Sequence, residues 1–270
     1  MYNILTKQIP TQFGNMVYYR SINEMQEILF IHGLGLNKEW FPHHYNSYSL
    51  HDFSWIIPDL IGHGKSAKPR YRLPYTMDQQ AQNLLSVLVE EEVKEIVIMA
   101  HSMGGPIAIS LIEQLMNQKT SEIKPVGLFY LEGNLDSNDA FISSRIAALS
   151  FEEFEKSFES ILRYYPSKIH NHLREMGPYP LWASSLDIVS ISKANQILPR
   201  LQKYLNFPTY FVFGEKNKGH FTSETLIKQA QLPLVFIPKA GHFMYNDNPD
   251  SFWKVIKQLI HSLDSMKNDN

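Results

Sequence analysis

A serine placed where a strand turns sharply into a helix can act as a nucleophile, and this sequence contains one such serine. Ser102 lies at the centre of residues 100–104 (AHSMG), directly after the apolar run at residues 96–99. Small residues two positions before and after the serine allow the turn to tighten, which exposes the serine oxygen. The usual pattern has glycine where Ala100 stands, and a single methyl group is accommodated there. Ser102 is therefore the candidate nucleophile.

A nucleophilic serine also needs donors for the negative charge that develops on the attacked oxygen. Residues 28–31 predict a buried strand, and it ends in the glycine-rich turn at residues 32–35. A turn of this type supplies one backbone N–H, and the residue after the serine supplies another. We therefore expect the amides of Leu34 and Met103 to form an oxyanion hole.

A histidine follows the last predicted strand of the chain. Residues 236–238 lead into the loop at residues 240–243, and this loop contains His242, the candidate general base. The other histidines have simpler interpretations. We expect His101 to be structural, His32 to bond to backbone, and His220 to lie on the surface or behind the site. The adjacent pair His43 and His44 lacks the spacing of metal ligands, and we infer no metal.

With the serine first and the histidine last, the chain resembles the α/β-hydrolase superfamily over roughly residues 4–263. Residues 56–66 also resemble the segment after that family's fourth strand, which shapes the floor below the site. The resemblance implies a mostly parallel, doubly wound sheet of eight strands with helices on both faces. Catalytic residues would lie on loops at the carboxyl ends of the strands, and the substrate stays open.

Hydrophobic periodicity agrees with this α/β architecture. Helical spacing of apolar residues predicts a helix over residues 77–92, with Thr76 as its N-cap, and a second helix over residues 102–116. A final packing helix is predicted over residues 251–263. Apolar or alternating runs bounded by turn residues predict strands at residues 4–9, 15–20, 28–31, 54–58, 96–99, 125–131 and 209–214.

The stretch between the strands at residues 125–131 and 209–214 is too long for one crossover. The resemblance implies a helical cap after the sixth strand, so we expect a cap at residues 134–205 and a hydrolase core at residues 1–133 and 206–270. Most cap aromatics should form its own small core, and a few should line an apolar pocket. These aromatics are Phe141, Phe151, Phe154, Phe158, Tyr164, Tyr165, Tyr179 and Trp182.

The carboxylate that orients the histidine has several candidates. In the superfamily that this chain resembles, this carboxylate follows either the sixth or the seventh strand. The usual seventh-strand position holds Asn217, which offers no anionic acceptor to a histidine Nδ1–H. Glu132 ends the sixth strand, as in some haloalkane dehalogenases with a catalytic glutamate there, and it is our first choice. The weaker candidates are Glu215, Asp136 and Asp139.

The dehalogenase resemblance does not extend to the reaction, because those enzymes use an aspartate nucleophile. A serine alkyl ether would be a dead end, so the expected chemistry is acyl transfer to Ser102 followed by hydrolysis. His242 would move the proton, and Glu132 would hold the correct tautomer. We expect a cofactor-independent serine hydrolase of the esterase, thioesterase or lipase type, acting on a small to medium acyl ester.

Two other classes of function stay open. A C–C bond hydrolase or an acyltransferase would use the same acyl-enzyme with a different outcome. A non-catalytic small-molecule receptor would keep the fold without the reaction, although an intact Ser102 and His242 argue against it.

Composition narrows the classes of partner. The chain has 270 residues, 44% of them hydrophobic and 19% charged, which suits one large globular domain. A net charge of -2 with scattered lysines and arginines gives no basic surface for nucleic acid. There is no cysteine, so disulfides and thiolate chemistry are excluded. We see no signal peptide and no run long enough to span a membrane, and we expect a cytoplasmic protein.

Overall fold

An eight-stranded sheet forms the centre of the computed structural model, which describes residues 4–23, 26–41, 53–117, 122–193 and 196–267. The strand order is β1-β2-β4-β3-β5-β6-β7-β8. β1 and β2 are antiparallel to their neighbours, and the pairs from β3 onward are parallel. The strands are β1 (Leu5–Thr11), β2 (Gly14–Ser21), β3 (Glu27–Ile31), β4 (Ser54–Pro58), β5 (Glu95–His101), β6 (Lys124–Leu131), β7 (Thr209–Gly214) and β8 (Leu234–Ile237).

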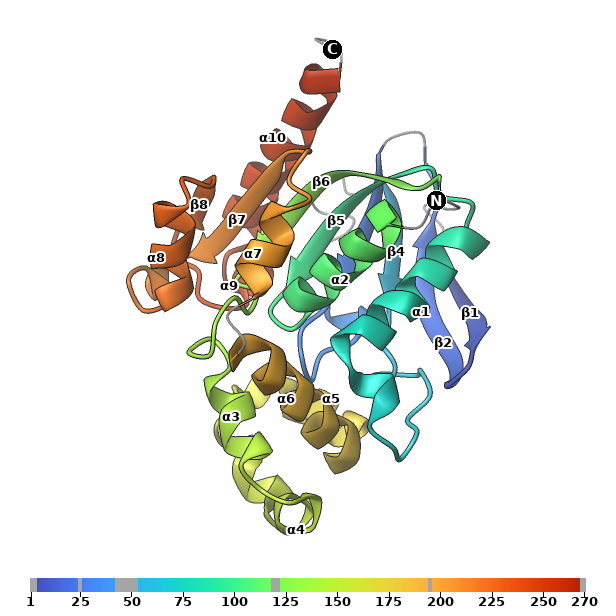
Figure 1. Ribbon diagram of the computed structural model, residues 1–270, viewed down its shortest axis with the longest axis vertical. Helices are drawn as coiled ribbons and strands as arrows, with labels where there is room; N and C mark the ends of the chain where they lie inside the picture. Colours follow the sequence, from blue (N-terminus) through green and yellow to red (C-terminus); the bar gives the residue numbers. More distant parts are fainter. Residues whose placement is uncertain (1–3, 24–25, 42–52, 118–121, 194–195, 268–270) are drawn as a thin grey trace.

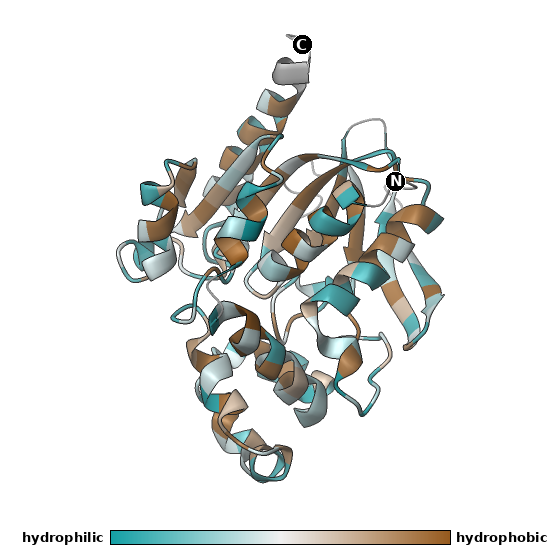
Figure 2. Cartoon of the chain, viewed as in Figure 1, coloured by the Kyte–Doolittle hydropathy of each residue, from teal (hydrophilic) through white to brown (hydrophobic). Residues whose placement is uncertain are grey.

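Helices cover both faces of this sheet because its central strands are apolar on both faces. Leu29 and Ile31 of β3 pack in one buried cluster, while Ile28 and Phe30 belong to the cluster on the opposite face. Successive side chains of a strand point to opposite faces, so such a strand must be covered twice. Figure 2 shows these central strands largely in brown. The expected mostly parallel α/β sheet is therefore confirmed.

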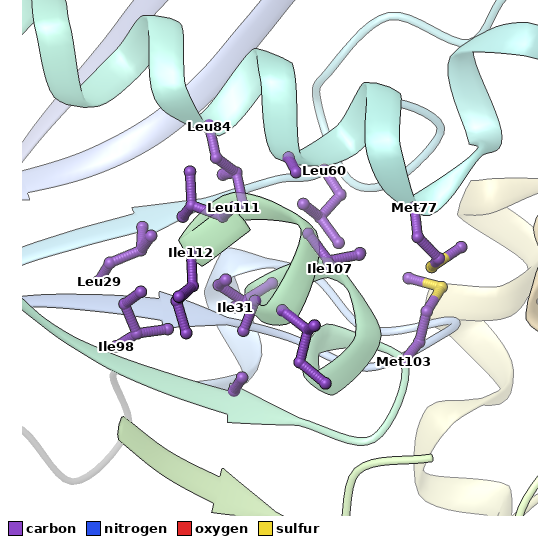
Figure 3. Close-up of a cluster of buried hydrophobic side chains, with 14 of the residues drawn as sticks. Leu29, Ile31, Leu60, Met77, Leu84, Ile98, Met103, Ile107, Leu111 and Ile112 are labelled. Atoms are coloured by element: carbon purple, nitrogen blue, oxygen red, sulfur yellow. The ribbon is translucent and has the colours of Figure 1, made fainter. Parts of the chain in front are cut away.

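The first of these clusters lies beneath α1 (Met77–Glu90) and α2 (Gly104–Asn117). Figure 3 shows side chains of both helices meeting those of β3 and β5. The opposite cluster includes α10 (Pro249–Lys267), which extends four residues beyond the predicted end of that helix. The predicted N-cap of α1 is confirmed, since the Thr76 side chain accepts a hydrogen bond from the Gln79 amide.

Several helices lie between β6 and β7 in the chain, where the sequence predicts a cap. Figure 1 shows α3 to α6 gathered beyond one end of the sheet. α7 instead packs on α2, where Arg200 and Glu113 form an ion pair of 2.5 Å. These helices are α3 (Phe141–Ala147), α4 (Phe151–Leu162), α5 (His170–Met176), α6 (Pro178–Lys193) and α7 (Ile197–Gln202), followed after β7 by α8 (Thr222–Gln229) and α9 (Met244–Asp247).

The aromatic side chains of this insertion divide between two environments. Phe154 is fully buried, and the rings of Phe151, Tyr179 and Trp182 contact one another. Tyr164, in contrast, is 43% exposed and lies beneath the guanidinium groups of two arginines. Aromatic content therefore predicted a packed cluster correctly, but it did not distinguish the rings that stay on the surface.

Candidate active site

Ser102 lies on a sharp turn between β5 and α2. Its φ is +54°, a left-handed backbone conformation that non-glycine residues rarely adopt. The Ser102 N–H donates to the Leu131 carbonyl at 3.1 Å, and the Ser102 carbonyl accepts from the Gly105 N–H at 2.9 Å. Because these residues form the turn, α2 begins at Gly104 and not at Ser102 as predicted.

Close packing explains why this turn needs small residues. A Cβ atom on Gly104 would lie 2.4 Å from the Ile31 carbonyl oxygen, and one on Gly33 would lie 2.9 Å from Ser102 Cβ. The two predicted turns are thus in direct contact. Ala100 is fully buried in β5, so its methyl group is accommodated as expected.

The predicted oxyanion donors are brought to the same cavity as Ser102. Leu34 and Met103 both line it, together with Gly33. Figure 3 shows the Met103 side chain pointing toward Met77 of α1, inside the buried cluster. Within the part of the chain that the structure describes, neither the Leu34 N–H nor the Met103 N–H donates to a protein acceptor. Both amides therefore lack a backbone acceptor within the described residues.

Glu132 contacts His242 across the carboxyl ends of the strands. It follows β6 with a φ of +40°, and its N–H donates to the Val212 carbonyl at 3.0 Å. Its side chain is 1% exposed, and its Oε2 lies 2.8 Å from His242 Nδ1. This geometry suits an Nδ1–H that donates to the carboxylate, which leaves Nε2 to face a substrate or a serine.

The weaker acid candidates bond to other groups instead. Glu215 Oε2 accepts from the Lys239 N–H at 2.9 Å. Asp136 Oδ1 accepts from the Asn138 N–H at 2.7 Å, and Asp139 Oδ2 accepts from the Leu135 N–H at 2.7 Å. These carboxylates stabilise loop backbone. Among the four candidates, the structure joins only Glu132 to His242 within the described residues.

Asn217 has a contact that sequence reasoning did not anticipate. Its Nδ2 donates to both carboxylate oxygens of Glu132, at 3.0 Å to Oε1 and 2.9 Å to Oε2. The Gly214 N–H also donates to Oε1, at 2.7 Å. The only available signal was that an amide occupied the position where relatives commonly carry the acid.

His101 supports the loop that carries His242. Its ring is fully buried, and Nε2–H donates to the His242 carbonyl at 2.9 Å. The Tyr245 hydroxyl lies 3.3 Å from Nδ1 of the same ring. Burial lowers the pKa of His101 well below its ordinary value, so the ring stays neutral. These contacts agree with the structural role expected of His101.

His32 bonds to backbone as predicted. Its Nδ1–H donates to the Gly33 carbonyl at 2.8 Å, and its Nε2 accepts from the Leu60 N–H at 3.1 Å. Burial lowers the pKa of His32 to about 4. A neutral His32 therefore holds the glycine-rich turn against the segment after β4.

That segment braces the site and does not form the floor of the cavity, which corrects the expectation. None of residues 59–66 lines the cavity. Asp59 is fully buried and accepts hydrogen bonds from the Lys38 N–H at 2.7 Å and from Lys38 Nζ at 2.9 Å. It also accepts from the Lys65 N–H at 2.8 Å. The segment thereby fixes the loop that follows the glycine-rich turn.

The cavity that contains Ser102 and His242 has a volume of about 280 Å³. Its wall is mostly apolar, and the inserted helices supply part of it. Of the eight aromatics predicted for the insertion, Phe141 and Tyr165 line the cavity. The other apolar residues of the wall are Leu34, Leu36, Met103, Ala140, Ile142, Pro166, Ile169, Ile188, Phe213, Phe221 and Phe243.

Asp139 in the cavity wall makes stability depend on pH. Burial raises its pKa from 3.8 to about 6, so the folded protein binds a proton that the unfolded chain releases between these values. Stability contributed by this group falls as pH rises through that window. We expect the free energy of unfolding of Asp139→Asn, relative to wild type, to rise by about 2 kcal/mol from pH 4 to pH 7. Urea denaturation at both pH values measures this, and an unchanged difference would contradict it.

The described residues contain neither a metal-ligand cluster nor a helix that could cross a membrane. Among them, no three histidine, aspartate or glutamate side chains are grouped so as to hold a metal ion. His43 and His44 lie outside the described residues. No helix in the described ranges is long and apolar enough to cross a membrane.

Comparison with known proteins gives consistent matches. The family model described as "Alpha/beta hydrolase family" matches residues 28–255. Lipase 3 of Moraxella sp. (strain TA144) is 28% identical over 86% of this chain and 74% of its own length. The AB hydrolase superfamily protein YisY of Bacillus subtilis is 30% identical over 94% of this chain and 98% of its own length. A solved structure of the N-acyl homoserine lactonase AidH matches with a TM-score of 0.74 at 19% identity, covering 97% of this chain and 98% of that one.

Proposed function

Since this chain belongs to the alpha/beta hydrolase family, we propose that it is a serine hydrolase that cleaves a carboxylic ester or thioester of small to medium acyl chain. The observation that carries the proposal is the 2.8 Å contact between His242 Nδ1 and Glu132, at a cavity that Ser102 also lines. The similarity to Lipase 3 is consistent with ester chemistry. The fold alone would not select this reaction.

The proposed reaction proceeds through an acyl-enzyme. Ser102 Oγ attacks the substrate carbonyl carbon while His242 Nε2 takes the Ser102 proton. Glu132 accepts the Nδ1–H and stabilises the imidazolium that forms. The N–H groups of Leu34 and Met103 bind the negative oxygen of the tetrahedral intermediate. His242 then protonates the departing alcohol or thiol, and water hydrolyses the acyl-Ser102 ester by the same steps in reverse.

The inserted helices would act as a cap over this reaction. Phe141 and Tyr165 from the insertion lie in the same cavity wall as Leu34 and Phe243 from the core. Side chains from both parts thus enclose one apolar space, which favours an acyl chain and excludes water from the oxyanion. Residues 134–205 are accordingly the proposed cap, with α7 as its attachment to the core.

The size of the cavity predicts which esters react fastest. A cavity of about 280 Å³ is at the lower end of the volumes usual for ligand sites. We expect kcat/KM for p-nitrophenyl esters to peak at a short or medium acyl chain and to fall at least about tenfold for a twelve-carbon chain. The measurement is initial rate across the series, with Ser102→Ala run in parallel. A peak at the longest chain would contradict the size, and hydrolysis of no ester would contradict the function.

A further inference from the structure

The carboxylate of Glu132 is held by a backbone N–H, a side-chain amide and the ring of His242. Gly214 N–H and Asn217 Nδ2 donate to Oε1, and Asn217 Nδ2 and His242 Nδ1 lie within 3 Å of Oε2. Within the described ranges, no lysine or arginine forms an ion pair with Glu132. A carboxylate buried in this way depends on hydrogen-bond donors for its charge and for its orientation.

Asn217 is itself placed firmly by the turn that follows β7. The Lys216 N–H donates to the Ala240 carbonyl at 2.9 Å, and the His220 N–H donates to the Asn217 carbonyl at 3.0 Å. A Cβ atom on Gly214 would lie 2.4 Å from the Gly241 carbonyl oxygen, so this turn packs against the loop that carries His242. The carboxamide of Asn217 therefore has a defined position relative to both Glu132 and His242.

A glutamate has more side-chain torsions than an aspartate and needs more restraint to present one oxygen. The end of β6 restrains the Glu132 backbone, but its side chain must still reach His242 with Oε2. The Asn217 amide contacts both oxygens at once, so it stabilises the charge of the whole carboxylate and limits how far the side chain can shift. Without Asn217, the described residues would leave each oxygen one of these contacts, Gly214 N–H at Oε1 and His242 Nδ1 at Oε2.

We infer that Asn217 is a positioning residue, which holds the Glu132 carboxylate so that Oε2 accepts a hydrogen bond from His242 Nδ1–H. The inference rests on the proposed function, because it assigns Asn217 a task within the Ser102, His242 and Glu132 site. The position that carries the acid in many relatives thus supplies a donor to an acid on the neighbouring strand. Asn217 also lines the cavity, but in this assignment it acts through Glu132.

Asn217→Leu tests the inference, because leucine keeps the branching at Cγ and removes the donor. We expect kcat on the best ester to fall about 10- to 100-fold with KM nearly unchanged, and the melting temperature to fall by a few degrees because the buried carboxylate loses a donor. Lys216→Leu, an exposed neighbour in the same turn, is the matched control and should retain wild-type kcat. Loss of kcat in both variants, or an unchanged kcat in Asn217→Leu, would overturn the inference.

A double-mutant cycle shows whether Asn217 acts through Glu132. In a Glu132→Gln background, adding Asn217→Leu should change kcat by less than about twofold, because the carboxylate to be positioned is already gone. If the two losses multiply instead, Asn217 acts elsewhere and the inference is wrong.

A spectroscopic measurement keeps the test independent of turnover. In protein with ¹⁵N-labelled histidine, the His242 Nδ1–H should give a far-downfield proton resonance that Glu132→Gln abolishes. We expect Asn217→Leu to shift or broaden this resonance and Lys216→Leu to leave it unchanged. An unaltered resonance in Asn217→Leu would overturn the positioning role, whereas ester hydrolysis retained by Ser102→Ala would instead overturn the proposed function.

Discussion

Ser102→Ala should lower kcat for ester hydrolysis by about 10⁵- to 10⁶-fold. Without Oγ, no acyl-enzyme can form, and a water molecule would have to attack the carbonyl directly. The residual rate would come from the oxyanion amides and from substrate binding, which the substitution leaves in place. Initial rates with a short chromogenic ester, at high enzyme concentration, measure the loss. The covalent phosphoryl adduct that an organophosphate forms with the serine oxygen, with loss of its leaving group, should be absent from the variant.

Two further variants show whether that loss is specific. Ser86→Ala removes a serine hydroxyl from α1, where it bonds to the Gln82 carbonyl, and should keep wild-type activity. Ser102→Gly should be as inactive as Ser102→Ala. It should unfold at a higher denaturant concentration than Ser102→Ala, because glycine adopts the positive φ of this turn without strain. Wild-type hydrolysis by Ser102→Ala would refute both the mechanism and the identity of the nucleophile.

Glu132→Gln should lower kcat by about 10³- to 10⁴-fold with little change in KM. The glutamine has the same shape, but it cannot stabilise the imidazolium that forms when His242 takes the serine proton. Its amide can also present N–H to Nδ1, which favours the wrong tautomer of the ring. Steady-state kinetics with the same ester separate kcat from KM and so measure this effect.

Glu215→Gln is the matched control for that substitution. Glu215 is a glutamate of the turn after β7, and its Oε2 accepts from the Lys239 N–H. The amide oxygen of glutamine can keep this bond, so we expect kcat within about threefold of wild type. A large loss in Glu215→Gln together with a small one in Glu132→Gln would reverse the assignment of the acid.

The candidate site combines two strained backbone positions on neighbouring strands. Ser102 ends the turn after β5 and Glu132 follows β6, and both have positive φ. Each also donates its N–H to the next strand across the sheet, to Leu131 and Val212 respectively. The sheet therefore stabilises both conformations from one side, which orients two side chains toward a shared edge at some cost in stability.

The residue types at neighbouring positions were enough to predict the nucleophile turn, the glycine-rich turn and the loop that carries His242. These predictions depend on residues within a few positions of one another, such as the small residues around Ser102, so the chain alone could show them. The strand positions could also be predicted from local residues. A run such as residues 54–58 needs only its own apolar side chains to indicate a buried strand.

Only the tertiary structure decided which carboxylate meets His242 and what Asn217 contacts. Glu132, Asn217 and His242 are far apart in sequence, and the order of β6, β7 and β8 brings their loops together. In the sequence, Glu215 and Asp139 are carboxylate candidates like Glu132. In the structure, each of the two accepts a hydrogen bond from a nearby backbone N–H. Those bonds depend on loop conformation, which hydrophobic periodicity does not encode. The same reason explains why the family resemblance placed residues 56–66 at the floor below the site, whereas none of them lines the cavity and Asp59 bonds to the loop that follows the glycine-rich turn.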